Sequence, residues 1–138
     1  MPGSTPDRLV LDTNTLVTAA LNGKFEAITA LQATHGISIF TCDKQLKEFE
    51  KTLNRVAKKL ASKPEGYISL FKEFSISVVI DERFDRSPDP DDNYLFDLAY
   101  TVKSFYLVTQ EKALLNMKQV NKIKIISFRE LRELIADR

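Results

Sequence analysis

Acidic residues recur directly after short apolar segments of this 138-residue chain. Such segments predict buried strands, and parallel strands bring the residues that follow them to one edge of a sheet. Carboxylates gathered at one edge repel each other unless a cation neutralises them, and hard oxygen ligands favour Mg²⁺ or Mn²⁺. We therefore predict a carboxylate metal site. Its acids, each with the segment before it, are Asp12 after 9–11, Asp89, Asp91 and Asp92 after 76–80, and Glu111 after 105–108.

Other kinds of catalytic site find little support in the sequence. With one cysteine, Cys42, and one histidine, His35, the chain has too few soft ligands for a zinc site of familiar spacing. A serine hydrolase triad would have to use His35, and the G-x-S-x-G turn that presents such a serine is missing. Gly-rich phosphate-binding loops are missing as well. The acids remain the best candidates for chemistry.

Each acid also has a simpler interpretation. Asp12 could cap the helix that follows it, and Asp91 or Asp92 could cap a later one. Glu48 lies among basic residues, away from the apolar stripe of its helix, so it could be a solvated surface residue. That helix begins at the same sheet edge, however, and its first turns could bring the Glu48 carboxylate to the other acids.

Strands and helices alternate along the chain. This order predicts a three-layer α/β/α fold, with a central parallel sheet of about five strands covered by helices on both faces. Residues 8–136 are expected to form a single domain, and residues 1–7 a flexible N-terminal segment. Ser127 and Glu130 predict a capping box for the last helix. The strands are expected at 9–11, 37–41, 76–80, 105–108 and 123–126, and the helices at 15–21, 25–34, 44–62, 67–74, from about 91, 113–117 and 127–136.

Composition indicates an ordinary soluble globular protein. The chain is 43% hydrophobic and 28% charged, and its net charge of +1 does not by itself indicate a nucleic-acid partner. Lys44, Lys47, Lys51 and Arg55 share one face of helix 44–62, which could bind RNA phosphates or simply be solvated. No apolar run is long enough for a membrane span or a secretory signal, so we expect a cytoplasmic protein without a membrane partner.

Four motifs resemble those of the PIN-domain ribonucleases, in particular the bacterial toxin components of toxin–antitoxin pairs to which VapC-like proteins are related. The resemblance extends from Leu9 to about Ile135. The motifs are Leu11-Asp12-Thr13-Asn14, the segment 42–48 ending at Glu48, the segment 89–93 containing Asp92, and Val108-Thr109-Gln110-Glu111.

The resemblance implies roles for individual residues. Asp12, Glu48, Asp92 and Glu111 would form the catalytic site, with Asp12, Asp92 and Glu111 as metal ligands. Asn14, Asn93 and Thr109 would be hydrogen-bond donors that hold these carboxylates in place. The site departs from the family pattern at one place, because Gln110, Glu111 and Ala113 stand where the family usually has Gly, Asp and a second Asp.

The implied activity is hydrolysis of RNA phosphodiester bonds by an Mg²⁺- or Mn²⁺-dependent endoribonuclease. The resemblance further implies an antitoxin protein and a homodimer as partners. The departures at Gln110 and Ala113 favour an alternative, a PIN-like module that binds RNA or protein without cutting. A third interpretation is a phosphotransfer domain with Asp12 as nucleophile, which would need a lysine after a later strand. Lys112, beside Glu111, suits that role poorly.

Overall fold

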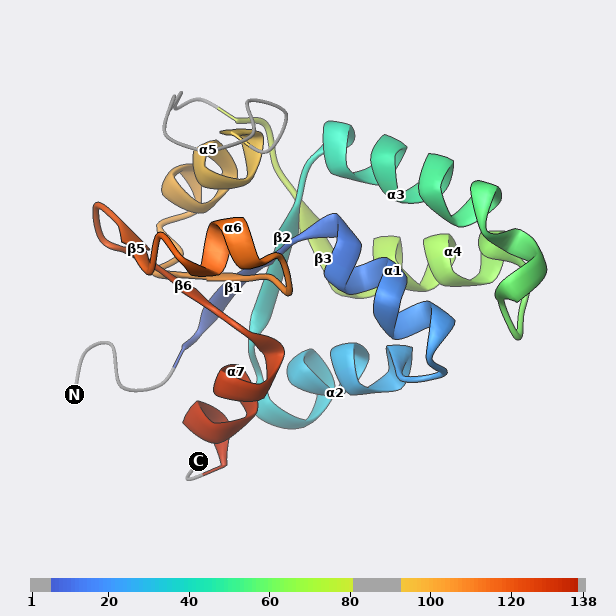
Figure 1. Ribbon diagram of the computed structural model, residues 1–138, viewed down its shortest axis with the longest axis horizontal. Helices are drawn as coiled ribbons and strands as arrows, with labels where there is room; N and C mark the ends of the chain where they lie inside the picture. Colours follow the sequence, from blue (N-terminus) through green and yellow to red (C-terminus); the bar gives the residue numbers. More distant parts are fainter. Residues whose placement is uncertain (1–5, 81–92, 137–138) are drawn as a thin grey trace.

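The computed structural model describes residues 6–80 and 93–136 (Figure 1). Helices and strands alternate over most of this length, as the sequence predicts. In chain order they are β1 (Arg8–Leu11), α1 (Thr13–Leu21), α2 (Phe25–His35), β2 (Ser38–Thr41), α3 (Asp43–Arg55), the 3₁₀ helix η1 (Ala57–Lys59), α4 (Pro64–Phe74), β3 (Ser75–Ser77), α5 (Asn93–Thr101), β4 (Tyr106–Val108), α6 (Lys112–Leu115), β5 (Gln119–Val120), β6 (Ile123–Ile126) and α7 (Phe128–Ile135).

The strands of the described residues form one six-stranded sheet in the order β3-β2-β1-β4-β6-β5. All neighbours are parallel except β5, which is antiparallel to β6. The predicted α/β class is thus confirmed, with one strand more than expected. The sequence prediction missed β5 because a strand of two residues is too short to carry a pattern.

The order of the strands reverses next to β1. From β1 the chain proceeds to β2 and β3 on one side, and it later returns to place β4 and β6 on the other side. Open α/β sheets bind ligands at such a reversal, beyond the carboxyl ends of the strands. The ends of β1 and β4 are therefore the expected location of a site.

Two apolar cores cover the two faces of the sheet. Leu9 and Leu11 face a core shared with α1, α2, α3, α4 and α7, whereas Val10 faces the core of α5 and α6. Successive residues of a strand point to opposite faces, so the continuous apolar run of β1 is what a strand buried on both faces requires. This is the predicted three-layer arrangement (Figure 1).

An aromatic cluster positions α3 in the larger core. The ring of Phe49 in α3 stacks on that of Phe25 in α2 at 6.0 Å between centroids, and it meets the ring of Phe71 in α4 edge-on at 5.4 Å. Such pairs add about 0.5–1.5 kcal/mol each beyond the burial of apolar area. Because Phe49 is fixed inward, the preceding residue, Glu48, is directed to a different side of the helix.

Three predicted boundaries differ from the structure. The helix predicted at 44–62 stops at Arg55 and continues only as η1. The helix predicted at 67–74 begins earlier, at Pro64, whose missing N–H costs nothing in the first turn of α4. The strand predicted at 76–80 is assigned only over Ser75–Ser77.

The N-terminal segment is described from Pro6 onward, and residues 1–5 lie outside the described part. Pro6 is buried, and the carbonyl of Asp7 accepts a hydrogen bond from the Ser38 N–H at 2.9 Å. The backbone is therefore paired with β2 one residue before β1 begins. Across the described ranges, no helix has the length and apolar character needed to cross a membrane.

Candidate active site

Asp12 lies at the carboxyl end of β1, where the strand order reverses. It is the N-cap of α1, and its Oδ1 accepts a hydrogen bond from the Asn14 N–H at 3.3 Å. Its Oδ2 accepts a second one from the hydroxyl of Thr109 at 2.8 Å, and only 3% of the residue is exposed. Asp12 therefore caps a helix, as its simpler interpretation predicts, and it also lies in a polar cluster between strand ends.

Thr109 connects Asp12 to the end of β4. Its side chain is fully buried, and its hydroxyl accepts a 3.0 Å hydrogen bond from the Glu111 N–H while donating to Asp12. Glu111 is half-buried and is the N-cap of α6. The predicted holding role of Thr109 matches this geometry, and the backbone of Glu111 is fixed beside Asp12 through one hydroxyl.

Glu48 reaches the site from α3. Its Oε1 accepts hydrogen bonds from the Thr13 hydroxyl at 3.0 Å and from the Tyr94 hydroxyl at 2.6 Å. The Thr13 and Tyr94 oxygens are themselves 2.9 Å apart. The interpretation of Glu48 as a solvated surface residue is therefore wrong. The carboxylate is half-buried and anchored to α1, next to Asp12, and to α5.

The sequence prediction missed Thr13 and Tyr94 as parts of the site. Tyr94 counted only as an apolar residue of its helix, although a buried tyrosine hydroxyl needs a polar partner. The need of a buried tyrosine hydroxyl for a polar partner could have indicated that Tyr94 belongs to a polar site. It does not by itself identify the partner, because Glu48 and Tyr94 are 46 residues apart in the chain.

The charge of Glu48 acts on Asp12. Burial raises the pKa of Asp12 above its ordinary value of 3.8, and the negative charge of Glu48 raises it further, against the lowering effect of the hydrogen bonds from Thr109 and Asn14. Burial also raises the pKa of Tyr94, as does its hydrogen bond to Glu48, so the phenol stays protonated and donates. The site thus holds negative charge away from water.

Gln45 fixes the start of α3 beneath this site. Its side chain is fully buried, its Nε2 donates to the Leu11 carbonyl at 2.6 Å, and its Oε1 accepts from the Thr41 hydroxyl at 2.7 Å. The side chain therefore joins the ends of β1 and β2 to the first turn of α3. Glu48 lies one turn further along the helix and is held in register with Asp12.

The donor set suits a hard cation. The described site offers carboxylate and hydroxyl oxygens, the ligands of Mg²⁺ and Mn²⁺, and no described basic side chain forms an ion pair with Asp12 or Glu48. Within 6–80 and 93–136, no three acidic, histidine or cysteine side chains lie close enough to hold a metal ion. Asp12 and Glu48 are brought together, whereas Glu111 does not complete a group of three with them.

Several predicted residues lie outside the site or outside the described part. The acids of the predicted loop, Asp89, Asp91 and Asp92, are outside the described residues, as is the side chain of Asn93. The side chain of Asn14 is exposed, and its contact with Asp12 is made by the backbone. The predicted RNA-binding residues Lys44, Lys47, Lys51 and Arg55 are all exposed on α3.

Lys44 also contacts the site. Its ammonium lies 5.0 Å from the centre of the Tyr94 ring, within the range of a cation–π interaction. The hydroxyl of the same ring donates to Glu48. Among the four predicted RNA-binding residues, Lys44 is therefore linked to the carboxylates through Tyr94.

The protein has an open α/β sheet, and the carboxylates of Asp12 and Glu48 lie where its strand order reverses. This arrangement is typical of sites that bind a metal ion or a phosphate through oxygen ligands. The family model of the PIN domain matches residues 8–113, well over half of the chain, and the chain therefore belongs to the PIN-domain family. PIN domains are generally nucleases and typically bind divalent metals. A comparison with curated protein sequences gives no significant match.

Proposed function

We propose that this protein is a metal-dependent endoribonuclease that hydrolyses RNA phosphodiester bonds at the Asp12 site. The observation that carries the proposal is the buried Asp12 carboxylate, held by Thr109 and facing the charge of Glu48 where the strand order reverses. A buried carboxylate beside a second, half-buried one, with no ion-pair partner among the described residues, is costly unless a divalent cation accompanies it.

The roles of the side chains follow from their contacts. Asp12 would bind the metal directly, and Thr109 would keep one carboxylate oxygen oriented. Glu48 would act as a second ligand or orient a metal-bound ligand, held by Thr13 and Tyr94. When bound, Mg²⁺ or Mn²⁺ stabilises charge on the phosphoryl group and lowers the pKa of the attacking water. Asp92 would complete the ligand set, and Glu111, which does not lie in a metal-sized group with Asp12 and Glu48, would take part through a water molecule.

The direct test is an RNA cleavage assay. Single-stranded RNA is incubated with the protein and Mn²⁺, with EDTA as the metal-free control, and the products are separated by size. We expect cleavage by the wild type and none by Asp12→Asn, which keeps the helix cap but loses the charge. Equal cleavage by both proteins would exclude Asp12 from the mechanism.

We further propose that the protein is the toxin of a toxin–antitoxin pair, acting on RNA in the cytoplasm. The support is the resemblance of its motifs to that branch of the PIN family. A small antitoxin that covers the acidic site and a homodimer are the partners this role implies. Induced expression in bacteria should arrest growth with the wild type and not with Asp12→Asn, at equal protein levels. Growth arrest by both variants would contradict the toxin role.

One observation favours a second candidate, a PIN module that binds RNA or protein without cutting. Glu111 and Ala113 replace two acids of the usual pattern, and Glu111 does not join Asp12 and Glu48 in a metal-sized group. Calorimetric titration with Mn²⁺ separates the two candidates. A nuclease should bind Mn²⁺ with an affinity that Asp12→Asn reduces, whereas a non-catalytic module should show no carboxylate-dependent binding.

A further inference from the structure

A pocket of about 230 Å³ opens beside the carboxylates, between α1, α2, α7 and the segment after β4. Thr15 contributes to its wall one turn after Asp12, and Gln110 contributes next to Glu111. The pocket is smaller than the roughly 300–1,000 Å³ of a site for a whole small molecule. It therefore suits a single chemical group at the same edge of the sheet as the proposed active site.

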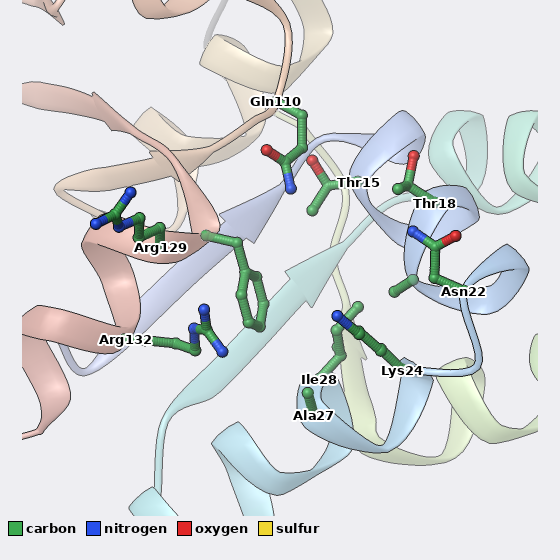
Figure 2. A pocket seen from close by; sticks show the side chains of 11 residues that line it. Thr15, Thr18, Asn22, Lys24, Ala27, Ile28, Gln110, Arg129 and Arg132 are labelled. Atoms are coloured by element: carbon green, nitrogen blue, oxygen red, sulfur yellow. The ribbon is translucent and has the colours of Figure 1, made fainter.

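Three of the described residues that line the pocket are basic and none of them is acidic. Lys24, Arg129 and Arg132 are among the eleven residues that form it. Figure 2 shows the Lys24 ammonium and the Arg132 guanidinium directed into the pocket from opposite walls, with the Gln110 amide above them. Neither Lys24 nor Arg132 forms an ion pair with a described residue. Both residues are exposed, and an anion placed between two cations that converge on one pocket is attracted by both of them.

A second, independent feature is the hydroxyl of Thr15. Within the described residues it is the one buried side-chain polar atom that has no hydrogen-bond partner. The residue is 3% exposed and belongs to the pocket wall. An unmet buried hydroxyl costs about 1–3 kcal/mol, so such an atom at a pocket wall points to a ligand that completes it. An anion with several oxygens would supply the hydrogen-bond acceptor that the Thr15 hydroxyl lacks among the described residues.

We propose that this pocket binds a phosphate of the RNA backbone next to the one that is cut. The inference rests on the proposed function and specifies how its substrate is held. Arg132 and Lys24 neutralise the phosphate charge, and Gln110 and Thr15 donate hydrogen bonds to its oxygens. Thr15 lies one helical turn after Asp12, and Gln110 directly precedes Glu111. An RNA strand whose phosphate is bound in this pocket would therefore continue towards the carboxylates. Contacts of this kind position RNA without reading its sequence.

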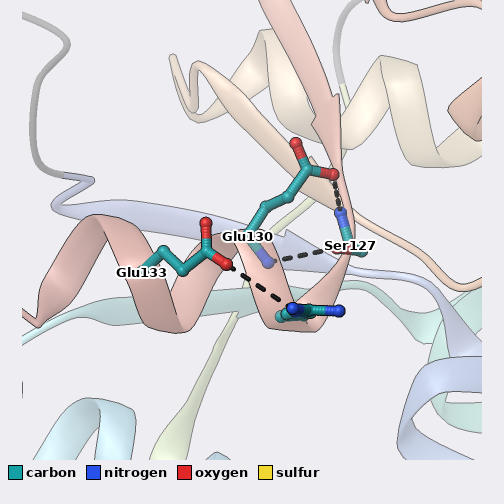
Figure 3. Close-up of polar contacts among 4 residues, drawn as sticks. Ser127, Glu130 and Glu133 are labelled. Carbon is teal, nitrogen blue, oxygen red and sulfur yellow. Dashed lines mark hydrogen bonds and ion pairs between the residues drawn. The ribbon is translucent and has the colours of Figure 1, made fainter.

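The last helix is built to present Arg132. Ser127 accepts a hydrogen bond from the Glu130 N–H at 3.1 Å, and the Glu130 carboxylate accepts one from the Ser127 N–H at 3.1 Å (Figure 3). This is the predicted capping box, confirmed. Arg129 is paired with Glu133 at 3.6 Å on the exposed side of the helix, whereas Arg132 forms no ion pair with any residue in 6–80 or 93–136. Arg132 and Lys24 are thus the residues to test.

The test measures RNA binding separately from cleavage. In the Asp12→Asn background with Mg²⁺, the affinity for a fluorescein-labelled single-stranded oligouridine is measured by anisotropy over a range of salt concentrations. We compare Arg132→Gln, Lys24→Gln and the charge-retaining Arg132→Lys. Lys72→Gln, at an exposed lysine of α4 outside the pocket, is the control for the same change in charge.

Loss of one phosphate contact should weaken binding and reduce the slope of log affinity against log salt by about 0.7. We expect this for Arg132→Gln and Lys24→Gln, and parent-like behaviour for Arg132→Lys and Lys72→Gln. If Arg132→Gln and Lys24→Gln both keep the salt slope of the parent, the pocket does not bind an RNA phosphate and the inference is overturned. The same result would be obtained if the pocket binds an acidic side chain of a protein instead. Failure of the proposed function appears differently, as absence of cleavage by the wild type.

Discussion

The Thr109 hydroxyl donates a 2.8 Å hydrogen bond to Oδ2 of Asp12 across 97 positions of sequence. The bond joins the ends of β1 and β4, the neighbouring strands between which the order of the sheet reverses. The backbone also holds the two ends together, because the Asp12 N–H donates to the Val108 carbonyl at 2.8 Å. The sheet therefore determines the orientation of the most buried carboxylate of the candidate site.

The first prediction concerns that bond. Thr109→Val removes the hydroxyl with little change in volume, frees one oxygen of Asp12 and leaves the Glu111 N–H without its acceptor. Loss of a group that orients a ligand typically lowers metal affinity or activity about 10–100-fold, and we expect a loss in this range. Mn²⁺ titration and the RNA cleavage assay measure it. Thr109→Ser, which keeps the hydroxyl, should stay close to the wild type, and equal losses in both variants would contradict the assigned role.

The second prediction concerns pH. The pKa of Asp12 is raised on folding, so the folded protein binds this proton more tightly than the unfolded chain. Without metal, stability should therefore rise as the pH falls through the raised pKa. Asp12→Asn lacks this titration. Its Tm should exceed that of the wild type at neutral pH, and the gap should shrink as the pH falls towards the ordinary value of 3.8.

Thermal unfolding in EDTA at several pH values checks this dependence. Adding Mn²⁺ at neutral pH should raise the Tm of the wild type and leave that of Asp12→Asn unchanged, because only the wild type keeps the ligand. A gap that does not change with pH would show that the Asp12 charge is not what destabilises the metal-free protein.

The third prediction concerns Tyr94. Tyr94→Phe removes the donor of the 2.6 Å hydrogen bond to Glu48 and the neighbour of Thr13. Hydrogen bonds to charged groups contribute about 1.5–3 kcal/mol, and we expect a loss of unfolding free energy in this range. Activity should fall about tenfold as Glu48 loses its orientation. The matched control is Tyr67→Phe, which removes a hydroxyl from a ring that meets Phe25 edge-on at 5.5 Å. An equal loss of stability and activity in Tyr67→Phe would refute the role of Tyr94.

The fourth prediction compares two threonines in the first turn of α1. Both are buried, but Thr13 is bonded to Glu48 and Tyr94, whereas the Thr15 hydroxyl has no partner among the described residues. Without RNA, Thr15→Val should raise the unfolding free energy by about 1 kcal/mol, and Thr13→Val should lower it by about 1–2 kcal/mol. Urea denaturation with constant m-values measures both. Destabilisation by Thr15→Val as large as that by Thr13→Val would show that the Thr15 hydroxyl is satisfied.

The sequence predicted the architecture because its strands carry strong local signals. The apolar run at 9–11 ends in an acid, and the following helices have clear apolar stripes, so the alternation of strands and helices and the position of Asp12 after a strand follow from pattern alone. Boundaries were harder to predict. Pro64 could end one helix or begin the next, and only the packing of α4 against α2 and α3 decides between the two.

The candidate site was harder to predict because its contacts join residues far apart in the chain. Asp12 was expected from its position after a strand and Thr109 from the family resemblance. The side of α3 on which Glu48 points, however, depends on how Phe49 packs. The sequence did not predict the basic pocket, because Lys24 and Arg132 belong to no recognisable motif and lie far apart in the chain. Their proximity arises only when α2 and α7 pack on the same face of the sheet.

Among the described residues, the sheet ends on both sides in a very short strand, with three residues in β3 and two in β5. Unpaired backbone groups along a long outer strand would invite other chains to add to the sheet, the usual beginning of aggregation. These two strands offer too little length for that. Self-association of this protein is therefore expected to use helical surfaces, which leaves the strand ends that carry Asp12 and Thr109 undisturbed by strand exchange between molecules.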